Sequence, residues 1–165
     1  MAIKDSFSPD EWKQLLQSVQ MVSLAVAASS PSGPLGAVQE MWAAGKLLAR
    51  MKTGGSSNEI ITAMVDDIST ADGRTRAQEG VRDLFKGLTA EQVRTKAIEA
   101  VKAVGGLVDR KVGGAQAVDF KQWLGSVSQS VAEAASEGGF LGFGGTAVSD
   151  AEKATLKDIS MALGL

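Results

Sequence analysis

The spacing of apolar residues constrains the fold of this chain more than any other feature. Along most of the sequence, apolar side chains recur every three or four residues, which places them on one face of an α-helix. Seven segments show this spacing, and none shows the sustained alternation of apolar and polar residues that is typical of a half-buried strand. We therefore expect an all-α protein with about seven helices in a compact bundle.

The apolar residues that define these segments fall into seven groups along the chain. In order, they are Trp12, Leu15, Leu16, Val19, Val22 and Val26; Val38, Met41, Trp42 and Leu48; Ile60, Ile61, Met64, Val65 and Ile68; Ala77, Val81, Leu84, Phe85 and Leu88; Val93, Ala97, Val101, Val104 and Val108; Phe120, Trp123, Leu124, Val127 and Val131; and Leu156, Ile159 and Leu163. The fourth segment is expected to begin after a break near Asp72 and Gly73, and the fifth to end at Gly113 and Gly114.

Three of the helix starts carry a capping-box pattern, in which a Ser or Thr is followed three residues later by Glu or Gln. The pairs are Ser8 with Glu11, Thr89 with Gln92, and Ser149 with Glu152. Pro9 adds to the first of these signals, because proline suits the first position of a helix. These pairs predict where three helices begin.

The length and charge of the chain favour one acidic domain. The 165 residues suit a single domain covering 1–165, and 44% of them are hydrophobic, which is ordinary for a globular protein. The net charge is −2, and basic residues between Arg74 and Lys111 alternate with acidic ones. This mixture indicates a solvated helix face, so nucleic acid is not an expected partner. A protein partner, including a second copy of the chain, is left open.

The chain contains no cysteine and no histidine. Disulfides, catalytic thiols and histidine bases are therefore excluded, as are the ordinary ligands of zinc, copper, haem and iron–sulfur centres. The side chains that could still take part in catalysis are carboxylates, Lys, Ser and Thr. The sequence shows no nucleophile paired with a base among them. We expect no cofactor and no enzymatic activity.

Targeting signals are not expected either. Residues 1–5 lack a basic region followed by an apolar run, so a signal peptide is not predicted. The most apolar stretch, between Val19 and Ala28, is interrupted by Gln20 and Ser23 and is too short to span a bilayer. We expect a cytoplasmic protein with no transmembrane segment.

The two ends of the chain resemble each other. Matching residues at a nearly constant offset include Lys13, Gln14, Leu16, Ser18 and Val19 with Lys121, Gln122, Leu124, Ser126 and Val127, and later Gly33, Leu35 and Gly36 with Gly139, Leu141 and Gly142. The pattern predicts an internal repeat of 12–50 and 120–163, in which two similar helical hairpins share a core. Because Ala and Ser are common here, coincidence is the alternative.

The C-terminal part of the chain resembles the tellurite-resistance TerB-like helical family. The resemblance is carried by Ala134, Ala135, Ser136, Glu137 and Gly138, then by Val148, Ser149, Asp150, Ala151, Glu152 and Lys153, and by Leu156, Ile159, Leu163 and Gly164. It implies a small all-α domain with a pseudo-symmetric pair of hairpins, and a link to stress or tellurite resistance. The whole chain also resembles uncharacterised bacterial proteins with a similar glycine-rich loop.

The acidic residues of the TerB-like family are associated with metal binding. Carried over to this sequence, the resemblance implies Glu137, Asp150 and Glu152 as candidate metal ligands. Glu137 stands where the family prefers Asp, and the following loop is longer than the family's. Asp150 and Glu152 also lie in the first turn of a predicted helix, where carboxylates are favoured by the helix dipole.

The glycine-rich loop between residues 138 and 147 is the most unusual segment of the sequence. Backbone N–H groups of such a loop can hold an anion, which makes Gly138, Gly139, Phe140, Phe143 and Gly144 candidate binding residues. The loop lacks the Gly-Lys-Ser/Thr ending of a P-loop. The alternative is a long turn whose aromatic side chains fill the core, with the glycines permitting tight backbone paths.

Two functions remain open at this point. The first is a non-catalytic helical interaction module. The second is a divalent-cation or small-molecule binder that uses the glycine-rich loop. Asp66, Asp67, Asp72 and Glu79 could suggest a calcium loop, but Arg74 and Arg76 intrude into the EF-hand spacing, and a helix end followed by a new N-cap explains these residues better.

Overall fold

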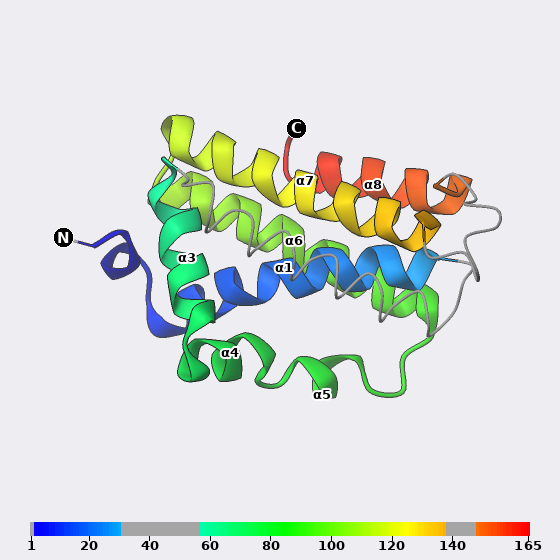
Figure 1. The fold of residues 1–165 in the computed structure, drawn as a ribbon, viewed down its shortest axis with the longest axis horizontal. Coiled ribbons are helices and arrows are strands. Elements are labelled where there is room, and N and C mark those ends of the chain that lie inside the picture. The colour runs from blue at the N-terminus through cyan, green and yellow to red at the C-terminus, as the bar shows by residue number, and fades with distance from the viewer. Residues whose placement is uncertain (1, 31–56, 138–147) are drawn as a thin grey trace.

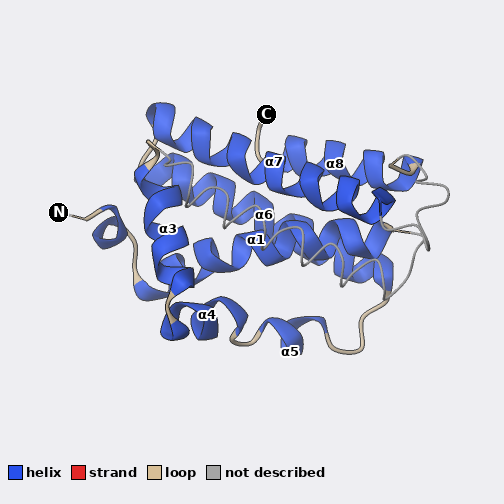
Figure 2. Cartoon of the chain, in the orientation of Figure 1, coloured by secondary structure: helices blue, strands red, loops and turns tan. Residues whose placement is uncertain are grey.

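The computed structural model of the protein describes residues 2–30, 57–137 and 148–165, and the side chains of 134–137 are not described. Within these ranges every regular element is helical and no strand occurs, so the predicted all-α class is confirmed (Figure 2). The elements are a 3-10 turn η1 (Ile3–Ser6) and the helices α1 (Pro9–Ser29), α3 (Glu59–Ser69), α4 (Ala71–Gln78), α5 (Val81–Phe85), α6 (Ala90–Lys111), α7 (Gly114–Glu137) and α8 (Asp150–Ala162). None of the helices in this part of the chain combines the length and apolar character needed to cross a bilayer.

Helix α1 is the centre of the fold. It contacts α6, α7 and α8, which run lengthwise beside it, and it also contacts α3 and α4 (Figure 1). Helix α3 stands across one end of this bundle, and α4 and α5 follow each other along one side of it. Because α1 has neighbours on several sides, it buries polar residues such as Gln17, Ser18 and Ser23 together with its apolar ones.

The three predicted capping boxes are confirmed, and they fix where α1, α6 and α8 begin. Ser8 Oγ accepts a hydrogen bond from the Glu11 N–H at 3.2 Å, while Glu11 Oε2 accepts one from the Ser8 N–H at 2.7 Å. Thr89 with Gln92 and Ser149 with Glu152 repeat this arrangement. Each box satisfies backbone donors that the first turn of a helix leaves without an intrahelical partner.

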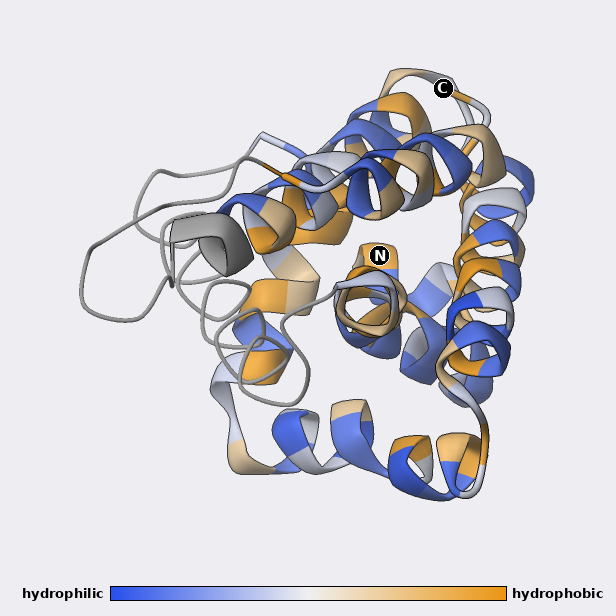
Figure 3. Ribbon diagram, turned by 90° about the vertical axis from the view of Figure 1, so that its right-hand side faces the viewer, coloured by the Kyte–Doolittle hydropathy of each residue, from blue (hydrophilic) through white to orange (hydrophobic). Residues whose placement is uncertain are grey.

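One continuous apolar core joins the helices. Its largest fully buried side chains are Phe120, Leu15, Leu16, Ile60, Met64, Leu124, Ile159, Leu163, Val22, Val26 and Val101. The ribbons alternate between hydrophobic and hydrophilic stretches, as expected of helices with one buried face (Figure 3). The three- and four-residue spacing in the sequence therefore identified the core positions of the long helices.

The internal repeat stays a prediction. Trp12 and Trp123 are both buried in the shared core, and α1 contacts α7. Superposition of the two hairpins would need residues 31–56 and 138–147, which lie outside the described residues. The predicted helix around Val38–Leu48 lies there as well.

The prediction for residues 77–88 is wrong in its detail. We expected one helix after a break near Asp72 and Gly73, but the break lies at Thr70, α4 runs through both residues, and residues 77–88 are divided between α4 and α5. Thr70 is the N-cap, and its hydroxyl accepts a hydrogen bond from the Gly73 N–H at 3.0 Å. A second break follows at Gly80, whose φ of 78° is left-handed and therefore ends the helical path before α5 begins.

Candidate binding groove beside helix α5

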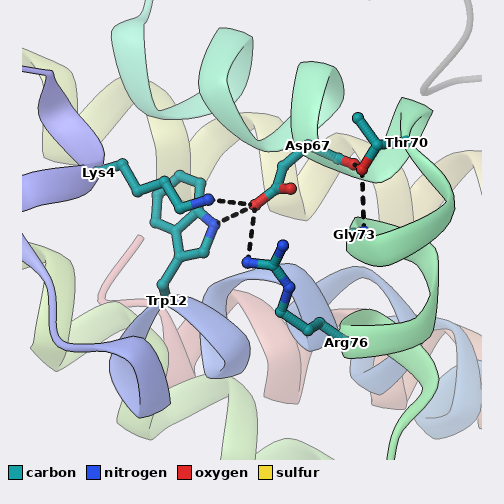
Figure 4. A network of polar contacts seen from close by, with 6 residues as sticks. All are labelled: Lys4, Trp12, Asp67, Thr70, Gly73 and Arg76. Atoms are coloured by element: carbon teal, nitrogen blue, oxygen red, sulfur yellow. Dashed lines mark hydrogen bonds and ion pairs between the residues drawn. The ribbon is translucent and has the colours of Figure 1, made fainter.

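A cluster of polar contacts around Asp67 joins the N-terminal turn, α1, α3 and α4 (Figure 4). Asp67 Oδ2 accepts hydrogen bonds from Lys4 Nζ at 2.8 Å and from Trp12 Nε1 at 2.7 Å, and it lies 3.8 Å from Arg76 Nη1. The carboxylate is 10% exposed, so these contacts are only partly screened by water. One side chain of α3 thus fixes three other elements.

The environment of Asp67 lowers its pKa. Partial burial by itself raises the pKa, but the hydrogen bonds from Lys4 and Trp12, together with the positive charges of Lys4 and Arg76, outweigh burial. The net result is a carboxyl group with a pKa below its ordinary value, ionised throughout the neutral range. This cluster is a structural anchor, because all the groups around the carboxylate hold it in place.

The end of α4 is fixed to α1 by a buried amide. Gln17 Nε2 donates a hydrogen bond to the Glu79 carbonyl oxygen at 2.9 Å and approaches the Arg76 carbonyl oxygen at 3.5 Å. Lys13 Nζ adds an ion pair with Glu79 Oε2 at 2.8 Å, and this contact lowers the pKa of the Glu79 carboxyl group. These contacts determine where the chain turns at Gly80 and therefore where α5 lies.

Helix α5 is held by few side chains. Val81 is buried, and Phe85 is half-buried against the core. Lys96 of α6 donates a hydrogen bond to the Leu84 carbonyl oxygen at 2.9 Å, and its ammonium lies 5.9 Å from the centre of the Phe85 ring. The Leu84 side chain is 47% exposed.

Two hollows border Phe85, and together we call them the α5 groove. The first has a volume of about 280 Å³ and lies between α1, α5 and α6. The residues that line it are Gln14, Gln17, Met21, Leu84, Phe85, Lys96, Ala100, Ala103 and Val104. The second is wider, about 710 Å³, and is lined by Leu24, Val81, Arg82, Asp83, Phe85 and Lys86. The α5 groove is therefore bounded by α5 on one side and by α1 and α6 on the other.

The wall that α1 gives to the groove is a single helical stripe. Gln14, Gln17, Met21 and Leu24 follow one another at intervals of three or four residues and so lie on one face. The opposite wall on α6 has small side chains, Ala100 and Ala103, which leave the space that the hollow occupies. Small side chains on α6 and long side chains on α1 together leave the first hollow open.

The first hollow is lined mainly by apolar side chains. Lys96 is the one ionisable side chain among its described lining residues, and its neighbours are apolar or carry amides. An apolar wall with a few polar groups is typical of sites that hold an apolar group and orient it.

Of the residues implicated by the sequence, Asp150 and Glu152 are described. Glu152 is buried, and its carboxylate accepts hydrogen bonds from the Ser149 N–H at 2.8 Å and from Ser149 Oγ at 2.9 Å. Asp150 is exposed, with Lys153 Nζ 3.8 Å away. In the part of the chain that the structure describes, no three Asp or Glu side chains gather to hold a metal ion. Glu137's side chain, and Gly138, Gly139, Phe140, Phe143 and Gly144, lie outside the described residues.

Sequence reasoning missed both the α5 groove and the role of Asp67. A signal for the anchor was present, since five acidic and basic residues crowd the region from Asp66 to Arg76: Asp66, Asp67, Asp72, Arg74 and Arg76. No motif marks the groove, because its walls come from three helices far apart in the sequence. Only the folded chain places them together.

Trp123 differs from Trp12 in its polar group. Its Nε1 is buried and, unlike the indole of Trp12, has no hydrogen-bond partner among the described residues. The ring packs on Phe120, with 5.8 Å between the ring centres. We have no physical account of this donor, and it marks no site.

Comparisons with known proteins found no match to this chain. Its sequence matches no protein-family model and no curated protein, and its structure matches no solved structure. The α5 groove must therefore be interpreted from its own geometry and charge.

Proposed function

We propose that the protein is a non-catalytic helical interaction module that holds an apolar group of a protein partner in the α5 groove. The observation that supports this most is the first hollow, where Met21, Phe85 and Val104 form apolar walls around about 280 Å³ of space. Burying an apolar side chain in such a space contributes about 25 cal/mol per Å² of surface removed from water. One well-seated side chain of a partner would thus provide a central anchor.

The surroundings of the hollow also favour a docking role. The side chain of Leu84 lines this hollow and is about half exposed. Few other large apolar side chains are exposed among the described residues. Gln14 and Lys96 add polar groups at the same edge. An apolar centre with a polar rim is the usual arrangement of protein–protein interfaces.

A selection of displayed random peptides tests this function. The purified protein should enrich peptides that share a bulky apolar residue, and Ala103→Trp should abolish the enrichment, because the indole would fill the hollow. Ala154→Trp, at an exposed position of α8, is the matched control and should retain it. Equal enrichment by the Ala103→Trp variant, or none by the natural protein, would contradict the proposal.

The biological setting that we propose is stress or tellurite resistance in a bacterium. It rests on the resemblance of residues 134–164 to the TerB-like family. A bacterial strain that lacks the gene should be more sensitive to tellurite, and the natural protein should restore growth while Ala103→Trp does not. Unchanged sensitivity of the deletion strain would contradict a role in tellurite resistance, but it would not contradict the proposed interaction module.

The alternative function, binding of a divalent cation or a small molecule by the glycine-rich loop, stays a prediction. Calorimetric titration with calcium, magnesium and manganese separates it from the interaction module. Heat that saturates at one ion per chain, and that is lost on Glu137→Gln, would favour the cation site.

A further inference from the structure

We infer that the partner segment seated in the α5 groove is acidic, with carboxylates beside its apolar anchor. This inference rests on the proposed function and adds to it the chemistry of the partner. It is carried by the charges that border the two hollows and by the absence of ion pairs for Arg82 and Lys86 among the described residues.

The border of the groove is basic on an acidic protein. Arg82, Lys86 and Lys96 bring three cations to it, against the single carboxylate of Asp83. The groove thus has a local charge of +2, whereas the whole chain has a net charge of −2. A local field of opposite sign to the rest of the surface steers partners of negative charge to that point.

The cations on α5 are available to a partner. Among the described residues, neither Arg82 nor Lys86 makes an ion pair, and both side chains are exposed. Some cations of the bundle are instead paired within the chain, as with Lys111 and Glu11, whose charged atoms lie 3.1 Å apart. Lys121 is likewise paired with Asp109 at 2.8 Å. Arg82 and Lys86 differ from these paired residues, because their charges are not compensated by a described carboxylate.

The spacing of these charges fits a peptide better than a flat surface. Arg82 lies in α5 and Lys86 occupies its C-cap position, and both line the second hollow. Lys96 extends from α6 to α5, where its ammonium donates a hydrogen bond to the Leu84 carbonyl oxygen. An apolar side chain that enters between α5 and α6 would therefore lie beside these cations. A hollow of about 280 Å³ takes a side chain, and a membrane surface could not enter it.

Two synthetic peptides with the same apolar residues test this inference. One repeats Glu-Leu-Leu-Glu and the other Lys-Leu-Leu-Lys, and each carries a fluorescent label for anisotropy titration. We expect the acidic peptide to bind the natural protein and the basic peptide not to bind. The double variant Arg82→Glu/Lys86→Glu should weaken the acidic peptide by at least about tenfold, since two attractions become repulsions.

The matched control is Lys153→Glu/Lys157→Glu, which changes the net charge equally but on exposed positions of α8. It should leave the affinity within about twofold, and added salt should weaken binding to the natural protein. Binding of both peptides alike, or an equal loss in both double variants, would overturn the inference. So would a preference for vesicles of anionic phospholipid over the peptide.

The outcomes also separate this inference from the function on which it rests. If displayed peptides are enriched through the groove but carry no carboxylates, the interaction module stands and the acidic partner is wrong. If Ala103→Trp changes neither the selection nor the titration, the groove itself is wrong.

Discussion

The four-helix part of the molecule and the segment that carries α4 and α5 are stabilised in different ways. Helices α1, α6, α7 and α8 bury long apolar stripes, and three of them begin with a capping box. In α4 and α5, three residues are buried: Gly73, Ala77 and Val81. This segment is held by polar side chains that reach it from α1, α3 and α6, notably Gln17 and Lys96.

This difference explains why the two regions serve different ends. Helices whose apolar faces are buried against one another leave little apolar surface for a partner to bind. The segment of α4 and α5 is positioned by a few directed contacts, so it can keep Leu84 and its basic residues exposed without loss of the core. Binding surfaces on segments that a rigid scaffold positions are common, because the scaffold carries the stability.

The largest expected effect is in the bundle. Phe120 is fully buried at 0% exposure, so Phe120→Ala should lower the free energy of unfolding by about 4 kcal/mol, through lost transfer energy and the cavity left behind. Urea denaturation followed by circular dichroism measures this. A loss below about 1 kcal/mol would mean that burial of Phe120 contributes little to the stability of the bundle. The proposed difference between the bundle and the segment of α4 and α5 would then be wrong.

The segment of α4 and α5 has one position where close approach of two backbones forbids a side chain. A Cβ atom on Gly73 would lie 1.8 Å from the carbonyl oxygen of Asp67. Gly73→Ala should therefore push α4 away from α3 and cost about 3 kcal/mol, near the upper end for overpacking. Arg74→Ala, at the next position and exposed, is the control and should cost less than about 1 kcal/mol. Equal stability of the two variants would contradict the observed packing.

The long helices could be predicted from the sequence because their signals are local. Capping residues and three- or four-residue spacing lie within one helix, and they located α1, α6 and α8 closely. The boundaries of α4 could not be predicted in this way. Thr70 was one of several residues suited to an N-cap, and the hydrogen bond of Gln17 to the turn before Gly80 joins residues far apart in the sequence.

The groove was beyond sequence reasoning for a different reason. Its walls combine residues from α1, α5 and α6, and none of them is unusual for its own helix. Ala100 and Ala103 are ordinary helix formers, and Leu84 fits the apolar spacing expected for a buried face. The spacing predicted Leu84 on a buried helix face, yet its side chain is 47% exposed.

Asp67 offers a test of the polar contacts between the two regions. Asp67→Asn removes the charge that Lys4 and Arg76 face, and it should cost about 2 kcal/mol at neutral pH, as for hydrogen bonds to a charged group. The folded protein lowers the pKa of Asp67, so its contribution is complete above the ordinary pKa of about 4 and is lost as the pH falls through the lowered value.

The difference between the natural protein and Asp67→Asn should therefore be constant near pH 7 and shrink below about pH 4. Asp66→Asn is the neighbouring control, because Asp66 is exposed on the same helix. A difference that stays unchanged down to pH 2, or that grows, would show that the carboxylate does not carry the stabilisation.

The two buried tryptophans separate a polar contact from simple packing. Trp12→Phe and Trp123→Phe remove similar volumes, but Trp12 alone donates a hydrogen bond to a carboxylate, whereas the indole N–H of Trp123 has no partner among the described residues. Trp12→Phe should therefore cost about 1.5 kcal/mol more than Trp123→Phe in urea denaturation. Equal costs would mean that the contact with Asp67 contributes nothing to the free energy of unfolding. The two tryptophans would then contribute equally to stability despite their different polar contacts.

The smallest expected effect on stability is at Leu84, where the comparison between the two regions is sharpest. Its side chain is 47% exposed, so Leu84→Ala removes little buried area and should change the free energy of unfolding by less than about 0.5 kcal/mol. The same variant should weaken binding of the acidic peptide by about fivefold or more, because the side chain lines the groove.

Met161→Ala is the matched control, since Met161 is 60% exposed, lies on α8 and does not line the groove. It should alter neither quantity. If Leu84→Ala instead lowered stability by 2 kcal/mol or more, the side chain would belong to the core, and the division between a stabilising bundle and a binding segment would be wrong.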